Sequence, residues 1–172
     1  MKSVKYFFQA ILLCFFFCIA KLIGLEFSRK LFAWIFLKFG SIFKSNKIID
    51  KNLNIVFKNL NETESQRIKK TMWENYGFTL AEYVFLNKFR LSNYSNRIIE
   101  IKGLENIKNI LEKNSRAIFI SGHFANFELM SMQLTKLGIN LSTIYRPLNN
   151  FFLNPLMEYL RKKYICKNQI KK

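Results

Sequence analysis

The chain has 172 residues, enough for one domain with a hydrophobic core, and half of these residues are apolar. Its 28 Lys and Arg against 11 Asp and Glu give a formal net charge of +17, which favours acidic partners: nucleic acid, anionic lipid or an acidic protein. The 19 Phe and the lack of helix-turn-helix or zinc-finger spacing argue against nucleic acid. With one His and three scattered Cys, we expect no metal site, no cofactor, no disulfide framework and a reduced, cytoplasm-facing domain.

Residues 6–25 are almost wholly apolar, interrupted by Gln9 and Lys21. Twenty helical residues extend about 30 Å, one hydrocarbon thickness, so this segment predicts a transmembrane anchor. A cleaved signal peptide is the rival interpretation, because Lys2 and Lys5 give a basic start, but the segment has no Ala-x-Ala cleavage site. More basic residues follow the segment than precede it, which predicts that the rest of the chain is cytoplasmic.

A second apolar and aromatic stretch, residues 31–43, is too short to span a membrane comfortably. It fits equally well an amphipathic helix in the headgroup region and a core helix of the globular domain. We therefore expect three parts: a membrane anchor at 1–25, an amphipathic, interfacial linker region at 26–60 and a globular domain at 61–172.

Three further elements precede the most informative part of the chain. Two overlapping capping boxes at residues 61–66, followed by apolar residues at helical spacing, predict a long amphipathic helix to about residue 84. Alternating apolar residues at 98–102 predict a strand, and residues 104–113 predict a short helix.

The candidate catalytic residues lie around His123, the only histidine of the sequence. It follows an apolar run at residues 117–120 that predicts a buried strand, and it precedes a helix that Asn126 could cap. His123 then lies on a strand-to-helix turn, with Glu128 in the first helical turn. A carboxylate there can reach the imidazole and hold one tautomer while the other ring nitrogen faces a substrate, although a purely structural histidine is the alternative.

The helix from Asn126 is predicted to end at Gly138, and residues 139–145 predict the next strand, which we expect to pair in parallel with 117–120. Ligands bind at the carboxyl ends of the strands in such sheets, and both His123 and Arg146 follow a strand's carboxyl end.

Arg146 is extended before Pro147 and presents a planar fork for a phosphate or an oxyanion, unless it is an ordinary surface arginine. A last helix is predicted from Asn154 and Pro155 to about residue 164. The basic residues that end the chain favour a solvated tail.

The sequence resembles the late acyltransferases of lipid A biosynthesis, the lauroyl and myristoyl transferases of Gram-negative bacteria. That family's signature, a Gly-His followed by an Asn-aromatic-acid, is similar to Gly122-His123 and Asn126-Phe127-Glu128, and its second block is similar to Ile144-Tyr145-Arg146-Pro147-Leu148. Matching positions upstream are Asn52-Leu53, Phe57, Trp73, Asn75, Gly77, Glu82 and Gly103-Leu104-Glu105.

The resemblance implies an α/β fold, in which an N-terminal membrane helix precedes an acyltransferase domain with a small, partly parallel sheet covered by helices. It implies transfer of a fatty acyl group from acyl carrier protein to a hydroxyl of a lipid A precursor at the bacterial inner membrane. His123 would be the general base and Glu128 its partner, with Arg146 and Asn126 at the substrate. Members of the family continue past the second block, so we expect an incomplete domain, truncated at the C-terminus, whose activity the sequence leaves open.

Two rival functions remain from the sequence. The first is acylation of glycerol phosphate or a lysophospholipid by a similar histidine-acid pair, although the acid there is usually Asp and Glu128 favours the lipid A branch. The second is a non-catalytic, membrane-bound fragment or interaction protein.

Overall fold

The computed structural model describes residues 2–172 and is mostly helical, with one small parallel sheet and an apolar N-terminal helix. The predicted fold class, α/β with a membrane-type helix, is confirmed. The chain divides into two compact units, each treated separately below. Unit 1 joins the N-terminal residues as far as Phe16 to Phe85–Lys172, and unit 2 is Phe17–Val84. The expected division at residues 25 and 60 stays a prediction.

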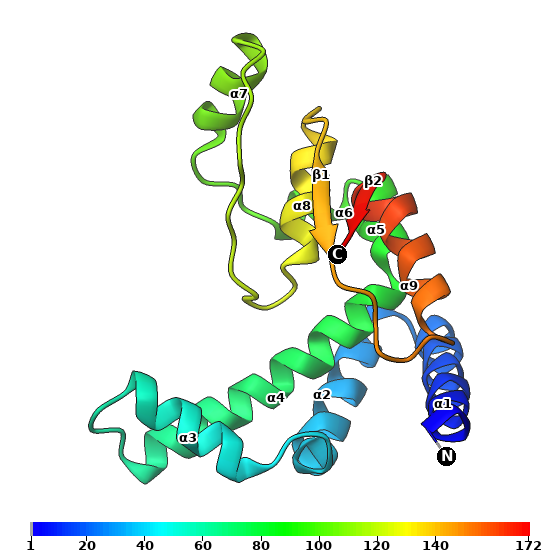
Figure 1. The fold of residues 1–172 in the computed structure, drawn as a ribbon, viewed down its shortest axis with the longest axis vertical. Helices are drawn as coiled ribbons and strands as arrows, with labels where there is room; N and C mark the ends of the chain where they lie inside the picture. The colour runs from blue at the N-terminus through cyan, green and yellow to red at the C-terminus, as the bar shows by residue number, and fades with distance from the viewer. Residues whose placement is uncertain (1) are drawn as a thin grey trace. The chain divides into compact units, whose positions relative to one another are not determined.

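The elements, labelled as in Figure 1, follow in chain order: α1 (Lys2–Ile23), α2 (Leu25–Phe43), α3 (Asn46–Val56), α4 (Glu62–Val84), α5 (Leu86–Leu91), α6 (Tyr94–Ile98), α7 (Leu104–Glu112), α8 (Glu128–Lys136), β1 (Ser142–Tyr145), α9 (Asn154–Leu160), the π-helical turn η1 (Arg161–Ile165) and β2 (Asn168–Lys171).

Helix α1 has the length and composition to cross a membrane: 22 residues, with a mean hydropathy of 2.2 in its most apolar window. Within residues 2–172 it is the one helix that meets this test. Only 11% of that window is buried, whereas the core helix of a soluble protein would be mostly covered. The helix ends before Gly24, whose φ of 81° only glycine adopts readily, and the chain turns there into α2.

Unit 2 is built on the close packing of α2 against α4. Gly77 of α4 lies against the backbone of Phe32 and Ala33, and a Cβ at Gly77 would collide with it. Phe32 and Ala33 are buried, while Trp34 and Ile42 on other sides of α2 are exposed. The prediction of a core helix for this stretch is therefore confirmed for one side of α2, and its exposed aromatic side is compatible with an interfacial position.

Helix α4 begins as the first of the two predicted capping boxes indicates, since the Glu64 amide donates a hydrogen bond to Asn61 Oδ1 at 2.8 Å, while Thr63, the cap of the second box, lies inside the helix. Its buried stripe includes Trp73, Gly77 and Ala81, at the four-residue spacing of one helix face.

Substitution of Gly77 by Ala should destabilise unit 2 by about 2 kcal/mol or more, because the added methyl meets backbone atoms that cannot rotate away. Thr71→Ala, at an exposed position of the same helix, is the control and should leave stability within about 0.5 kcal/mol of wild type. Chemical denaturation followed by circular dichroism measures both, and a Gly77→Ala variant as stable as Thr71→Ala would contradict the packing described.

The sheet of unit 1 differs from the predicted one. Strand β1 pairs in parallel with β2, with Ser142 opposite Asn168 and Tyr145 opposite Lys171, and α9 and η1 connect the two strands. Residues 168–171, which belong to the predicted solvated tail, are mostly exposed, but they form a strand instead of an irregular tail.

The predicted strand at 117–120 was also wrong, because these residues are irregular and Ile118 and Ile120 are 91% and 93% exposed. A strand needs a neighbour for its backbone hydrogen bonds, and residues 117–120 have none in the part of the chain that the structure describes. The predicted strand at 98–102 fails for the same reason: α6 occupies residues 94–98 and irregular chain follows.

Helix α8, whose first residue is a predicted site residue, is anchored at its far end by α5. The Arg90 guanidinium donates to Thr135 Oγ1 at 2.7 Å and to the carbonyl of Met132 at 3.2 Å. Met132 is fully buried, and Gly138, with a φ of 97°, follows the end of the helix as predicted. These contacts fix the direction in which the start of α8 points.

Candidate active site

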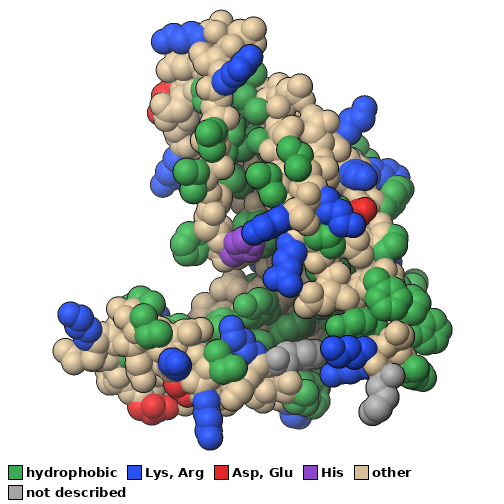
Figure 2. Space-filling model, viewed as in Figure 1, with side chains coloured by type: hydrophobic (Ala, Val, Ile, Leu, Met, Phe, Trp, Pro, Cys, Tyr) green, Lys and Arg blue, Asp and Glu red, His purple; other side chains and the backbone are tan. Residues whose placement is uncertain are grey.

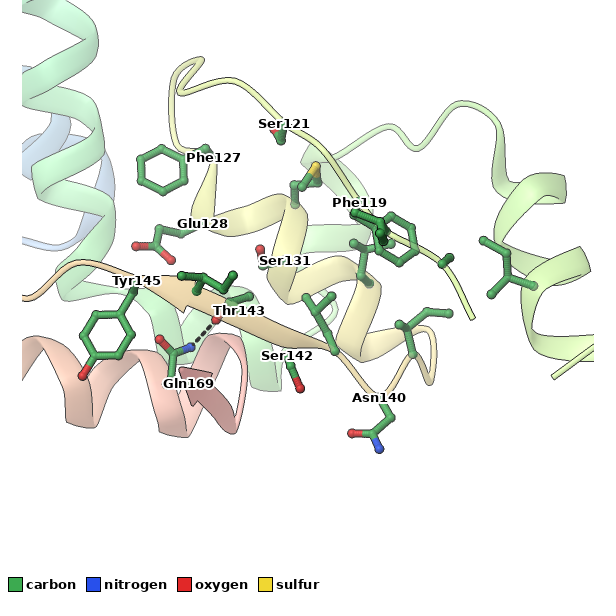
Figure 3. Close-up of a pocket in the computed structure, with 18 of the residues that line it drawn as sticks. Phe119, Ser121, Phe127, Glu128, Ser131, Asn140, Ser142, Thr143, Tyr145 and Gln169 are labelled. Carbon is green, nitrogen blue, oxygen red and sulfur yellow. Dashed lines mark hydrogen bonds between the residues drawn. The ribbon is translucent and has the colours of Figure 1, made fainter. Parts of the chain in front are cut away.

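A cavity of about 1020 Å³ lies in unit 1, lined by the irregular chain before α8, by α8 itself and by β1 (Figure 3). Much of its lining is apolar, including Ile118, Phe119 and Leu141. Its lining also includes one His, one Glu and three Arg side chains: His123, Glu128, Arg116, Arg146 and Arg161.

His123 is exposed at the entrance of the cavity, on irregular chain rather than directly after a strand. The ring of Phe127 lies 4.1 Å from the imidazole, centroid to centroid, at an angle of 52°. Between them Ala125 has a φ of 43°, a left-handed conformation that a residue with a Cβ rarely adopts. This tight turn brings the histidine back over the start of α8, and Figure 2 shows the one histidine at the surface beside Lys and Arg side chains.

Glu128 occupies the first turn of α8, as the sequence predicts, and it is only 7% exposed. Its carboxylate is held by Arg161: Nε and Nη2 lie 2.7 and 2.6 Å from Oε1. Figure 3 shows Glu128 projecting from the start of α8 toward the side of β1. A charge-assisted pair of this kind fixes the carboxylate position more firmly than a neutral hydrogen bond.

Arg161 was not among the predicted site residues, because the basic residues near the C-terminus were expected to be solvated. The spacing of Arg161 from an apolar residue of the predicted last helix nevertheless indicated that it faces the protein. Met157 is buried in α9, and Arg161 follows it by four residues, which places both on the same side of the helix. A buried carboxylate such as Glu128 requires a cation of this kind nearby.

Arg146 directly follows β1, is exposed and lines the same cavity as His123, as predicted. The expectation that both residues follow the carboxyl end of a strand was wrong for His123, because the residues directly before it are irregular. Asn126 is not among the residues that line the cavity. Its carbonyl accepts a hydrogen bond from the Leu129 amide at 3.1 Å, but no side chain caps α8, so the predicted side-chain cap is wrong.

The end of β1 is tied to α9 beside Arg146. The Tyr145 hydroxyl donates to Glu158 Oε1 at 2.5 Å, and Asn154 Nδ2 donates to the same oxygen at 2.8 Å. These two hydrogen bonds lower the pKa of the Glu158 carboxyl, and the bond to Glu158, with some burial, raises the pKa of Tyr145.

A model of the bacterial lipid A biosynthesis acyltransferases matches residues 1–167. No curated protein and no solved structure matches the chain. Because the family match covers nearly the whole sequence, the chain belongs to the bacterial lipid A biosynthesis acyltransferase family. The family implies an acyltransferase, with an acyl donor and a lipid acceptor.

Replacing Arg161 by Gln should destabilise unit 1 by about 3 kcal/mol, because the buried Glu128 loses its counterion. Lys162→Gln, the exposed neighbouring position, is the matched control and should change stability little. Adding Glu128→Gln to Arg161→Gln should restore part of the loss, since no unpaired charge is then buried. Denaturant unfolding measures all three variants, and equal stabilities for Arg161→Gln and Lys162→Gln would contradict the pairing.

Tyr145→Phe should move the pKa of Glu158 up toward its ordinary value of 4.5, since it removes the hydrogen bond that lowers it most. A depressed folded-state pKa contributes stability above the unfolded-state pKa, and this is lost as pH falls through the folded-state pKa. The variant should therefore lose less stability than wild type on acidification below about pH 4.5. Carboxyl NMR titration measures the shift, with Tyr159→Phe as the control, because Tyr159 bonds Lys163 instead.

Proposed function

We propose that the chain transfers a fatty acyl group from the thioester of acyl carrier protein to a hydroxyl of a lipid A precursor, with His123 as general base. The observation that carries the proposal is that His123, Glu128 and Arg146 line one largely apolar cavity, in a chain whose family acylates lipid A precursors. An apolar lining suits a fatty acyl chain, and the charged groups suit the reacting ends of the two substrates.

In the proposed reaction, the imidazole of His123 takes the proton from the acceptor hydroxyl as its oxygen attacks the thioester carbonyl. The tetrahedral intermediate then collapses, the carbon–sulfur bond breaks, and the imidazolium returns the proton to the departing thiolate. The acyl group goes directly to the lipid, so no covalent acyl-enzyme forms. The Phe127 ring, 4.1 Å from the imidazole, limits the orientations that the imidazole can take.

In this proposal Glu128 orients the imidazole of His123 and stabilises the positive charge that the ring gains when it takes the proton. Its position is fixed by Arg161, because the guanidinium contacts Oε1 through two nitrogens. We therefore assign Arg161 as a positioning residue that acts through Glu128. Arg146 offers a planar fork at the cavity for a phosphate of the lipid or for the developing oxyanion. The backbone N–H groups at the start of α8, which follows Asn126, favour an anion.

Charge and hydropathy support the proposed donor and location. A net charge of +17 attracts an acidic carrier protein and anionic lipid headgroups alike. We assign the chain to the bacterial inner membrane, held there by α1, with its two units facing the cytoplasm. Basic residues such as Arg29, Lys30 and Lys38, which follow α1, support that orientation.

The test is acyl transfer by the full chain in membranes, with acyl carrier protein thioester as donor and a lipid A precursor as acceptor. His123→Ala should lower the rate by about 10²–10⁴-fold, the usual contribution of a general base. It should leave the chain's membrane association unchanged. Lys113→Ala, exposed and outside the cavity lining, is the control and should retain wild-type activity.

A His123→Ala variant with more than about a tenth of the wild-type rate would rule out the general-base role. Absence of transfer by the wild-type chain would favour a non-catalytic role instead.

A further inference from the structure

The side of α2 that faces away from α4 carries aromatic, aliphatic and basic side chains. Trp34 is 54% exposed, and Phe27, about two helical turns before it, is 69% exposed. Lys30, Leu37 and Lys38 stand three or four residues from Trp34, which places them next to it on the helix, and all three are exposed. We call these residues the α2 surface. They all belong to unit 2, so their arrangement lies within one compact unit.

The opposite side of α2 is covered by α4. Phe32 is 2% exposed, and a Cβ on Gly40 would collide with the ring of Trp73. The Arg29 guanidinium pairs with Glu82 of α4, with 3.4 Å between Nε and Oε1. These contacts fix which side of α2 is buried, so the helix cannot rotate to cover the α2 surface. Contiguous exposed apolar side chains of this kind mark an interaction surface.

The side chains of the α2 surface suit a membrane better than a protein partner. Tryptophan is enriched at the boundary between hydrocarbon and headgroups, where its ring is apolar and its N–H can bond to water or lipid. Lys38 Nζ lies 5.2 Å from the centroid of the Trp34 ring, so the charge and the ring are presented together. Neither Lys30 nor Lys38 is ion-paired within residues 2–172. Lysine is depleted in the cores of protein interfaces, whereas anionic lipid surfaces attract it.

The place of α2 in the chain supports the same partner. Helix α1, which has the composition of a membrane-crossing helix, ends at Ile23, and only Gly24 separates it from α2. Ser28 is fully buried, and its Oγ lies 3.1 Å from the carbonyl oxygen of Ala20 and 2.6 Å from that of Gly24. The first turn of α2 is therefore bonded to the last turn of α1, inside unit 2. Where α1 leaves the hydrocarbon, α2 begins at the level of the headgroups.

We propose that the α2 surface docks onto anionic phospholipid headgroups and gives the chain a second membrane contact beside α1. Phe27, Trp34 and Leu37 enter the boundary between headgroups and acyl chains, and the ammonium groups of Lys30 and Lys38 contact lipid phosphates. The contact holds unit 2 at the membrane surface through a side of α2 that α4 leaves uncovered. This inference rests on the membrane location in the proposed function and not on the reaction.

Tryptophan fluorescence tests the contact, because the sequence has two tryptophans, of which Trp34 is exposed and Trp73 is buried. The full chain is reconstituted in vesicles of phosphatidylglycerol and phosphatidylcholine, with the phosphatidylcholine brominated either near the headgroup end or near the methyl end of its acyl chains. We expect the shallow bromines to quench wild type at least about twofold more than Trp34→Phe, which retains only the buried Trp73. The deep bromines should quench wild type less than the shallow ones do.

Removal of charge tests the headgroup contact. Lys30→Gln with Lys38→Gln should lower the quenching by shallow bromines about twofold, because each lysine near the surface adds to the attraction for anionic lipid. Lys51→Gln with Lys70→Gln removes two exposed charges from α3 and α4 of the same unit and is the matched control, with wild-type quenching expected. Equal quenching of the two double variants would overturn the proposed contact with anionic headgroups.

Three other results would overturn the proposal. If acrylamide, a water-soluble quencher, reaches Trp34 and the lipid bromines do not, the α2 surface faces water. If neither quencher reaches Trp34, a protein such as a second copy of this chain covers it. Stronger quenching by the deep bromines would place Trp34 inside the hydrocarbon.

The fluorescence measurement needs no catalysis, so His123→Ala should show wild-type quenching. Wild-type quenching without acyl transfer would refute the proposed reaction and leave this inference standing. Acyl transfer without quenching of Trp34 would refute this inference alone.

Discussion

The contact on which the site depends is the ion pair between Glu128 and Arg161. It joins the start of α8 to the start of η1, and at the other end of both elements Thr135 Oγ1 donates to the carbonyl of Ile165 at 2.8 Å. Helix α8 is thus bound to η1 at both ends, and this fixes one wall of the cavity. Burial of an ion pair adds little net stability, because desolvation offsets the attraction. Its contribution is to restrict where the carboxylate lies.

Local features of the fold were predictable because they depend on neighbouring residues. The start of α4 follows from the capping oxygen of Asn61, the end of α8 from Gly138, and the start of α9 from Pro155. The helical spacing of apolar residues predicted a helix at 104–113, and α7 ends one residue earlier, at Glu112. These signals act over a few residues and require no knowledge of what packs against them.

Features that depend on distant partners were not predictable to the same degree. Residues 117–120 have the composition of a strand, but β1 pairs instead with residues 168–171, whose composition suggested a solvated tail. For the site, the sequence predicted His123, Glu128 and Arg146 from local motifs, and all three line one cavity. It missed Arg161, which reaches Glu128 from 33 residues away, and it overstated the capping role of Asn126.

We propose that this cavity moves an acyl group directly from a carrier thioester to a membrane lipid. The most direct measurement uses the full chain in lipid vesicles with a radiolabelled acyl carrier protein thioester, with and without a lipid A precursor. We expect label in the lipid when the acceptor is present and no label on the protein when the acceptor is absent. Label that accumulates on the protein without acceptor, or none in the lipid with it, would contradict the claim.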